Sequence, residues 1–285
     1  MTWEGFKMFN PTIDVIVAQS KFRRPPDMTF EGILKRFPGL AEADAVCWTG
    51  STAIGWGNVF SDFDLFAFSD RTLELPVDET MERWPGSDKS GISWENWMGE
   101  YEKARVDLTI WSPDAFATVL QPYLDDEVEL CGTSDAMLAF VYRMSIAVPL
   151  KNDDYFREMH ELLARSSFRR ARARTPKVWA ENALTDVAGQ LDAGDHASAL
   201  ISARVAAFRV TDACLALYGD YCHAEKWTMR RLESKPECGI SVDEFRSEVL
   251  AGIRPGESDG DAALRMARWA QKHIVRLEGE FLAVS

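Results

Sequence analysis

Strand signals and helix signals occupy different parts of this 285-residue sequence. Up to about residue 132, short apolar runs alternate with Gly, Pro, Ser and Asp, which is typical of a chain that alternates strands and helices. From about Ser134 onward, long segments rich in Ala, Leu and Arg carry apolar residues at helical spacing. We therefore predict an α+β protein of two domains, residues 1–132 with strands and helices and residues 133–285 as an α-helical bundle.

Individual elements can be placed within these two parts. The clearest strands are 44–49, 63–68 and 105–111, each bounded by turn formers or charges. Residues 71–104 show little periodicity and are compatible with a loop, a hairpin or part of a pocket wall. Helices are predicted, from apolar spacing and capping residues, over 134–147, 153–166, 177–193, 195–218, 222–233, 241–252 and 259–283.

Composition favours a soluble protein. Hydrophobic residues make up 46% and charged residues 27% of the chain, and no apolar stretch approaches the roughly 20 residues that a spanning helix needs. The N-terminal residues do not resemble a secretion signal, so we expect a cytoplasmic protein without membrane contact. The five widely spaced cysteines favour neither a disulfide framework nor a zinc site, and we expect reduced, mostly buried thiols.

The net charge of −13 lies almost entirely in the first domain. Residues 1–132 contain 11 Lys and Arg against 23 Asp and Glu, whereas residues 133–285 contain 21 against 22. An acidic surface repels the phosphate backbone of nucleic acids and attracts metal ions and cationic small molecules. A nucleic-acid substrate is therefore disfavoured.

The chemistry-bearing segment joins a Gly-Ser turn to a pair of aspartates. An apolar strand runs into Gly50-Ser51, and ten residues later Asp62 and Asp64 flank Phe63 at the head of the next strand. Because side chains alternate faces along a strand, both carboxylates project to the same side. Their repulsion at neutral pH is most simply relieved by a divalent cation with hard oxygen ligands, of which magnesium is the natural choice.

Two further features suit phosphoryl chemistry. Gly50 lacks a Cβ and lets a phosphate approach the backbone, while the Ser51 hydroxyl and the following amides can donate hydrogen bonds to it. A two-metal site needs another carboxylate, and Asp107 offers one in a strand whose alternate positions are apolar. We expect Asp107 to face Asp62 and Asp64.

This pattern of Gly-Ser, ten residues, Asp-Phe-Asp-Leu and a later strand carboxylate resembles the DNA polymerase β-type nucleotidyltransferase superfamily. The resemblance covers about residues 44–111. The helical second half is similar in kind to the small-molecule branch, the aminoglycoside nucleotidyltransferases. The resemblance implies an N-terminal polymerase β-like nucleotidyltransferase domain, with a mixed sheet and helices, followed by a helical domain that shapes the acceptor site.

Roles follow from this resemblance position by position. Gly50 and Ser51 would hold the β- and γ-phosphates, Asp62 and Asp64 would bind two Mg²⁺ ions, and Asp107 would bind the catalytic ion and help deprotonate the acceptor. The implied reaction transfers a nucleoside monophosphate, expected to be AMP from ATP, to a hydroxyl of an aminoglycoside-like antibiotic or natural-product intermediate, with release of pyrophosphate. Nucleotidylation of a protein side chain and a catalytically silent nucleotide-binding scaffold are the alternatives, and the oligomeric state stays open.

Several other residues carry weaker signals. A glutamate or aspartate base outside the strand motif cannot be assigned, although Glu181, Asp186 and Asp212 are candidates to inspect. Five positive charges fall within residues 169–177, where a solvated helix end with salt bridges is favoured over contact with a triphosphate or a nucleic-acid acceptor. For Arg204 and Arg209, pocket lining and pairing between helices are both open. The four histidines are expected on helix surfaces or in the core rather than as ligands.

Overall fold

The computed structural model describes residues 28–58, 60–76, 81–102, 104–124 and 132–283. The chain divides into two compact units. The sheet unit comprises Met1–Pro113 and Ile146–Phe156, and the helical unit comprises Asp114–Ser145 and Arg157–Ser285. The domain boundary predicted between residues 132 and 133 stays a prediction, but strand β6 (Val148–Lys151), which follows that boundary, pairs within the sheet.

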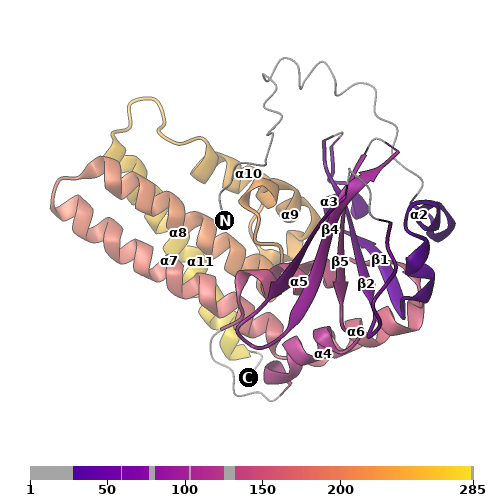
Figure 1. The fold of residues 1–285 in the computed structure, drawn as a ribbon. Helices are drawn as coiled ribbons and strands as arrows, with labels where there is room; N and C mark the ends of the chain where they lie inside the picture. Colours follow the sequence, from indigo (N-terminus) through magenta and orange to yellow (C-terminus); the bar gives the residue numbers. More distant parts are fainter. Residues whose placement is uncertain (1–27, 59, 77–80, 103, 125–131, 284–285) are drawn as a thin grey trace. The chain divides into compact units, whose positions relative to one another are not determined.

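A six-stranded mixed sheet forms the centre of the sheet unit (Figure 1). Its order is β3-β4-β5-β2-β1-β6, with β2 and β5 parallel and the other neighbours antiparallel. The predicted strands are confirmed, and of the alternatives left open for residues 71–104 the structure contains a hairpin. The strands are β1 (Ala45–Thr49), β2 (Phe63–Phe68), β3 (Glu82–Ser87), β4 (Ser93–Tyr101) and β5 (Ala104–Trp111).

One face of the sheet packs against α2 (Phe30–Arg36) and the 3₁₀ turn η1 (Pro38–Glu42). Apolar residues at alternate strand positions, such as Leu65 and Leu108, are buried there with Ile33 of α2. The Tyr101 hydroxyl donates a hydrogen bond of 2.9 Å to the Gly32 carbonyl and so fixes the helix on β4. The hydrophobic core of this unit therefore lies under α2.

The opposite face of the sheet changes character along the strands. Phe66 and Phe68 of β2 are buried at one end, where Phe66 contacts Trp111 edge-on with ring centroids 5.8 Å apart. Phe68 packs against Tyr155 in the first turn of α6. At the other end the same face carries Asp64. The aromatic packing and Asp64 therefore lie at opposite ends of this face.

The helical unit contains most of the helices. Its elements are α4 (Ala115–Leu120), η2 (Gln121–Tyr123), α5 (Asp135–Ser145), most of α6 (Asp153–Arg165), α7 (Phe168–Asp192), α8 (His196–Leu217), η3 (Glu225–Trp227), α9 (Thr228–Ser234), η4 (Pro236–Cys238), α10 (Val242–Phe245), the π-helical turn η5 (Arg246–Leu250) and α11 (Asp259–Ala283). The predicted helical second half is confirmed.

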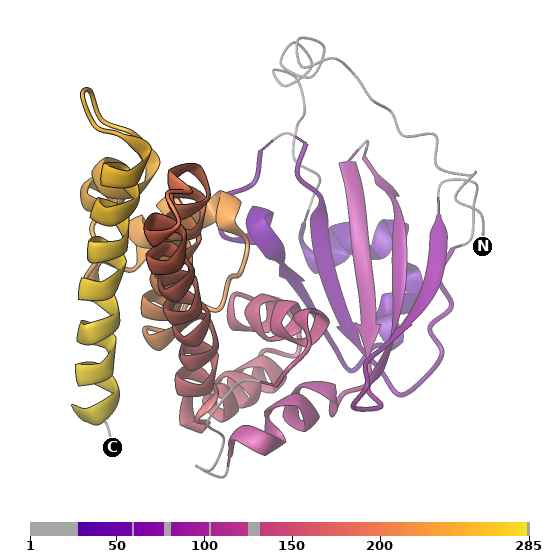
Figure 2. The same ribbon diagram turned by 90° about the vertical axis from the view of Figure 1, so that its left-hand side faces the viewer.

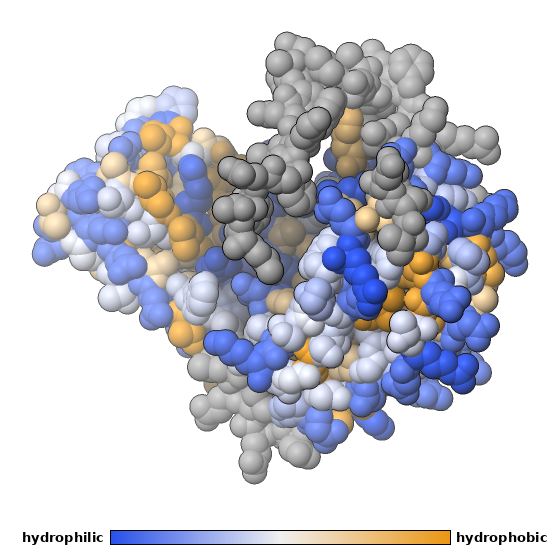
Figure 3. All heavy atoms as spheres, viewed as in Figure 1, coloured by the Kyte–Doolittle hydropathy of each residue, from blue (hydrophilic) through white to orange (hydrophobic). Residues whose placement is uncertain are grey.

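Helices α7, α8 and α11 run side by side in both ribbon views (Figures 1 and 2). Fully buried alanines, including Ala206 and Ala207, form the contact face of α8. Small side chains let helix backbones approach closely, and larger residues such as Phe245 and Leu277 fill the remaining space. On the face viewed in Figure 3, hydrophobic residues of this unit occur in small groups among hydrophilic ones.

Two predicted helix boundaries were wrong. Helix α7 begins at Phe168 rather than at residue 177, and Pro176 lies inside it. An interior proline costs a helix about 3 kcal/mol through a lost hydrogen bond and a clash with the carbonyl four residues earlier, but it fits the helical φ, so tertiary packing can hold a long helix that contains it. The helix predicted from residue 222 begins only at Thr228, because the amide of Cys222 donates to the Asp220 carboxylate in a turn.

A buried charge network links α8, the following turn and α9. The fully buried Arg231 donates from Nη1 to Asp212 at 2.6 Å and from Nε to Asp220 at 3.1 Å. Burial opposes the charge of Arg231, but the two carboxylates more than offset it, so the pKa of Arg231 lies above its ordinary value. This network holds the irregular segment 218–227 against α8.

None of the helices in the described part of the chain is long and apolar enough to cross a membrane. Cys47, Cys214, Cys222 and Cys238 are buried free thiols, as the sequence predicted. Cys131 lies outside the described residues.

Candidate functional site

Parallel pairing of β2 and β5 places two of the predicted site residues side by side. The register sets Asp64 directly opposite Asp107, followed by Phe66 opposite Thr109. Residues opposite each other in a sheet point to the same face, so both carboxylates project from the sheet face opposite α2, at its acidic end. The expectation that Asp107 faces Asp64 therefore follows from the strand register.

Asp62 precedes β2 by one residue and lies near the same point. Its Oδ1 atom is 3.5 Å from Nε of Arg105, the residue two positions before Asp107 on β5. The side chain of Asp62 is 35% exposed and that of Asp107 is 31% exposed. These carboxylates are thus accessible from solvent.

Arg105 is the site residue that sequence reasoning missed. Its guanidinium donates to both oxygens of Asp107, from Nε at 3.0 Å and from Nη2 at 2.9 Å. The hydrogen bonds to Asp107 are the main cause of its raised pKa; burial opposes them, and the charges of Asp107, Asp62 and Asp64 add to them. Arg105 therefore contacts two of the three aspartates and is influenced by the charge of the third. The signal available in the sequence was the two-residue spacing of Arg105 and Asp107, which puts both on one strand face.

The turn at Gly50 fits against Asp64. Gly50 follows β1 with a φ of +75° and opens the single turn α3 (Gly50–Ala53). A Cβ added to Gly50 would lie 2.0 Å from Oδ2 of Asp64. The carboxylate therefore occupies the space that any other residue type would fill, and the Gly50-Ser51 turn and the aspartate form one site.

Hydrogen bonds hold the loop between Ser51 and Asp62. The Ser51 carbonyl accepts from the amides of Trp56 at 2.8 Å and Gly57 at 2.9 Å. Thr52 accepts from the Trp48 indole at 3.1 Å and donates to the Asp62 carbonyl at 3.3 Å. Thr52 thus ties the start of the loop to the residue at its end, which fixes Asp62 relative to the Gly50-Ser51 turn.

Tryptophans of β3 and β4 lie on the same sheet face, at the level of Thr109 and Trp111 of β5. On β3 and β4, Trp84 and Trp94 both aim their indole N–H groups at the Asn96 amide, whose oxygen accepts them at 3.2 and 3.1 Å. Trp94 also packs against Trp111 at a centroid distance of 4.9 Å. Trp84 is 43% exposed. These tryptophans therefore extend the aromatic end of the face across β4 and β3.

Magnesium binding depends on how the oxygen donors of this site are arranged. In the described residues, no three His, Cys, Asp or Glu side chains are arranged so that they could hold a metal ion. Arg105 contacts Asp62 and Asp107, so a positive charge already lies among these carboxylates. Hard oxygen donors gathered around one cation match the ligand preference of Mg²⁺, which would have to displace the guanidinium.

The candidate acids of the helical unit have structural partners instead. Asp212 is bound to Arg231, and Glu181 pairs with Lys177 at 2.8 Å. The positively charged run at 169–177 is not simply a solvated helix end, because Arg172 within it is only 6% exposed. Arg172 lines a cavity of the helical unit together with Arg209, His223 and Glu225.

No family model matches this chain, and no curated protein sequence matches it. Among solved structures, the chain is similar to a nucleotidyltransferase-like protein from Exiguobacterium sibiricum 255-15. The TM-score is 0.45 at 10% sequence identity, over 86% of this chain and 73% of that chain. A similarity of this degree assigns no residue a role.

Proposed function

We propose that the protein is a metal-dependent nucleotidyltransferase. The observation that carries this proposal is the meeting of the Gly50-Ser51 turn with the paired carboxylates, in which Asp64 lies against Gly50 and opposite Asp107. A turn without a Cβ beside clustered hard oxygen ligands is the arrangement that phosphate and Mg²⁺ require together. The sequence pattern of Gly-Ser, Asp-x-Asp and a later strand carboxylate supports the same function.

In this proposal each side chain has a defined task. Gly50 and Ser51 bind the β- and γ-phosphates of a nucleoside triphosphate through the backbone and the Ser51 hydroxyl. Asp62, Asp64 and Asp107 would hold two Mg²⁺ ions, whose charge would make the acceptor hydroxyl easier to deprotonate and the pyrophosphate easier to release. Asp107 also accepts the proton of that hydroxyl. The oxygen then attacks the α-phosphorus, and the bond to the leaving pyrophosphate breaks.

The acceptor is proposed to be a hydroxyl of a small molecule, with AMP as the transferred group. The exposed Trp84 and the acidic sheet face favour an acceptor with an apolar ring surface and amino or hydroxyl substituents, as an aminoglycoside-like compound has. Aromatic rings pack on the hydrocarbon faces of such sugars, while carboxylates attract their ammonium groups. Cytoplasmic location and antibiotic modification belong to the same proposal.

A catalytically silent nucleotide-binding protein is the second candidate function, and one observation favours it. Arg105 neutralises Asp107 with a bidentate ion pair and also contacts Asp62. If that pair is permanent, the carboxylates have a structural role and no metal enters. The two candidates differ in whether metal and triphosphate bind together.

The test is calorimetric binding of ATP, GTP, CTP and UTP to the full chain, with and without Mg²⁺. The transferase proposal expects binding that requires Mg²⁺ and is lost in an Asp62→Asn/Asp64→Asn variant. The exposed Asp70, beyond the end of β2, provides the matched control Asp70→Asn, which should bind normally. At about 100 times the dissociation constant, the nucleotide should stabilise the fold by roughly 2.7 kcal/mol.

The outcomes separate the candidates. Binding that does not depend on Mg²⁺ and survives the double substitution supports the silent protein. No binding of any triphosphate contradicts both. Where Mg²⁺-dependent binding is found, incubation with α-labelled nucleotide and a panel of aminoglycosides identifies the acceptor by transfer of label and release of pyrophosphate.

A further inference from the structure

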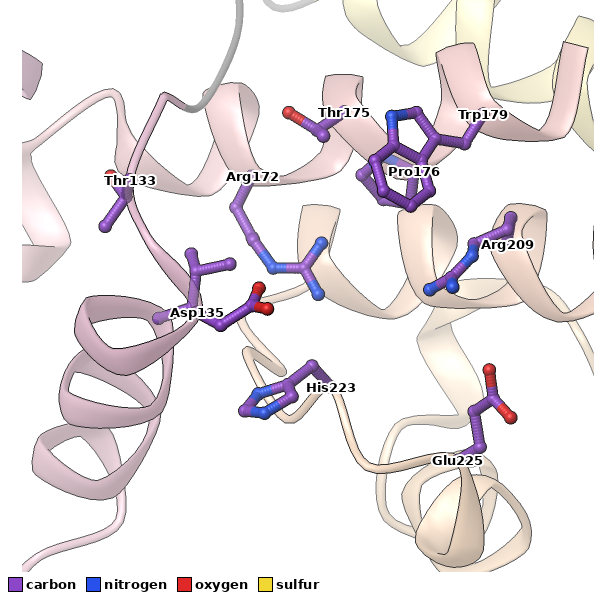
Figure 4. Close-up of a pocket in the computed structure, with 10 residues that line it drawn as sticks. Thr133, Asp135, Arg172, Thr175, Pro176, Trp179, Arg209, His223 and Glu225 are labelled. Carbon is purple, nitrogen blue, oxygen red and sulfur yellow. The ribbon is translucent and has the colours of Figure 1, made fainter. Parts of the chain in front are cut away.

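A cavity of about 560 Å³ lies within the helical unit, and its described lining residues include none of the residues of the proposed transferase site. Its walls come from α5, α7, α8 and the segment that follows α8 (Figure 4). Ligand pockets for small molecules typically measure roughly 300–1,000 Å³. The cavity is therefore large enough for a molecule of the size of a sugar phosphate.

Two arginines project into this cavity from neighbouring helices. Figure 4 shows the guanidinium groups of Arg172, on α7, and Arg209, on α8, pointing toward one another across the open space. Arg172 is 6% exposed. Two guanidinium groups that converge on one space form a fork suited to phosphate or carboxylate oxygens.

Arg209 is held in place without using its hydrogen-bond donors fully. Its guanidinium lies over the Trp179 ring, 5.2 Å from the centroid, which fixes its position by a cation–π contact. The Asp212 oxygen beside it is 3.8 Å away, too far for a hydrogen bond, and that carboxylate is already bound to Arg231 at 2.6 Å. Arg209 is thus preorganised and can donate to a ligand.

The pKa of His223 depends on the charged residues around the cavity. Burial lowers its pKa, and the positive charge of Arg172 lowers it further. Asp135 and Asp212 act in the opposite direction, and Arg231 adds to the lowering. The imidazole therefore stays neutral at neutral pH, where it can exchange hydrogen bonds with a ligand, and an anion bound beside Arg172 would raise its pKa.

Two carboxylates also line the cavity. Asp135 lies beside Arg172, and the Glu225 carboxylate points up from the far side toward Arg209. Carboxylates at these positions can accept hydrogen bonds from hydroxyl or amino groups. The Trp179 and Pro176 surfaces supply an apolar wall.

We infer that this cavity binds a small hydroxylated molecule that carries a phosphate or carboxylate group between Arg172 and Arg209. The inference goes beyond the transferase proposal and does not depend on it, because all the described residues that line the cavity belong to the helical unit. The phosphate and carboxylate forms share the same guanidinium recognition and are separated by the choice of probes.

The test uses glucose 6-phosphate, gluconate and uncharged glucose as probes of the full chain, with affinity measured by calorimetry. At least one anionic probe should bind about tenfold or more tightly than glucose, because charge-assisted hydrogen bonds are the stronger ones. Preference for glucose 6-phosphate identifies phosphate, and preference for gluconate identifies carboxylate. Equal binding of all three probes, or binding of none, contradicts the inference.

Variants assign the binding to the cavity. Arg209→Gln keeps a long polar side chain without the charge and should weaken the binding of the anionic probe about tenfold. Arg204→Gln, on the exposed part of the same helix, should leave the affinity unchanged. Nuclear magnetic resonance of the His223 ring should show its pKa rising when the probe binds. Unchanged affinity in Arg209→Gln, or an unmoved His223 pKa, contradicts the inference.

The transferase and cavity proposals fail separately. The Asp62→Asn/Asp64→Asn variant should bind the anionic probe with wild-type affinity. If it loses the probe, the anion binds at the sheet unit and the cavity inference is wrong, whereas loss of nucleotide binding alone concerns only the transferase site.

Discussion

Oδ2 of Asp64 lies 2.0 Å from the point where a Cβ on Gly50 would be. The two residues are fourteen positions apart, on the turn after β1 and on β2, and β1 pairs with β2 so that Thr49 lies opposite Asp64. This antiparallel register carries the turn onto the carboxylate. The glycine at this position is therefore required both by the backbone, with a φ of +75°, and by the aspartate.

Gly50→Ala should destabilise the fold and abolish Mg²⁺-dependent nucleotide binding. The left-handed backbone alone costs an alanine roughly 1–2 kcal/mol, and displacement of Asp64 adds to this. Gly55→Ala separates the two effects, because Gly55 has a similar φ of +73° and nothing within 4 Å of an added Cβ. Urea unfolding should show a smaller loss for Gly55→Ala. Equal losses would mean that Asp64 moves aside freely.

Arg105→Gln should make the acidic end of the sheet more responsive to magnesium. The substitution removes the cation that Asp62 and Asp107 share, and their repulsion then favours a divalent ion. Without metal we expect a loss of no more than about 1 kcal/mol, because the pair is partly exposed. The melting temperature should rise with Mg²⁺ more in the variant than in the wild type.

Arg83→Gln is the matched control for this prediction. It breaks another ion pair of the same sheet, between Arg83 and Glu95 at 2.6 Å. The change in melting temperature on addition of Mg²⁺ should be the same in Arg83→Gln as in the wild type. An identical Mg²⁺ response of Arg105→Gln and Arg83→Gln would argue against a metal site at the three aspartates.

Stability should fall between pH 6.5 and 4 because of His273. This side chain is 1% exposed, and burial, with a further contribution from Arg276, lowers its pKa to about 4, although Glu244 acts in the opposite direction. The unfolded chain binds the proton near pH 6.5, so acid favours unfolding as the pH drops through this window. The full shift corresponds to a loss of about 3 kcal/mol.

A His273→Gln variant should show a shallower decline over the same range, measured by urea unfolding at several pH values. His223 also has a lowered pKa and contributes in the same direction, so some decline should remain. An unchanged slope in the variant would mean that His273 is protonated in the folded protein.

Arg231→Met should destabilise the helical unit strongly. It leaves Asp212 and Asp220, whose side chains are 5% and 8% exposed, as buried carboxylates without their shared cation. Removing one partner of a buried ion pair typically costs about 3–5 kcal/mol. Arg246→Met breaks the exposed pair with Asp243 and should change the stability by less than about 1 kcal/mol. Thermal unfolding compares the two variants, and similar losses would contradict the structural role of Arg231.

The sequence by itself determined the local order of the chain. Apolar runs bounded by turn formers or charges identified β2 and β5. The alternation of side chains along a strand predicted that Asp62 and Asp64 project to one side, because side-chain direction is a property of the local backbone. Helical spacing likewise predicted α6, α8 and α11 with ends within two residues of those observed. The same reasoning failed at Pro176. The local rule that proline interrupts helices placed the start of a helix after Pro176, whereas α7 runs through it.

Only the tertiary structure decided which of these local features meet. The pairing of Asp64 with Asp107 and the position of Arg105 beside them both depend on the β2–β5 register. The fit of Gly50 against Asp64 depends on the pairing of β1 with β2. The return of β6 to the sheet and the approach of Arg172 to Arg209 join segments far apart in sequence. Such contacts form because distant apolar faces pack together, and no local pattern in a single sequence specifies that pairing.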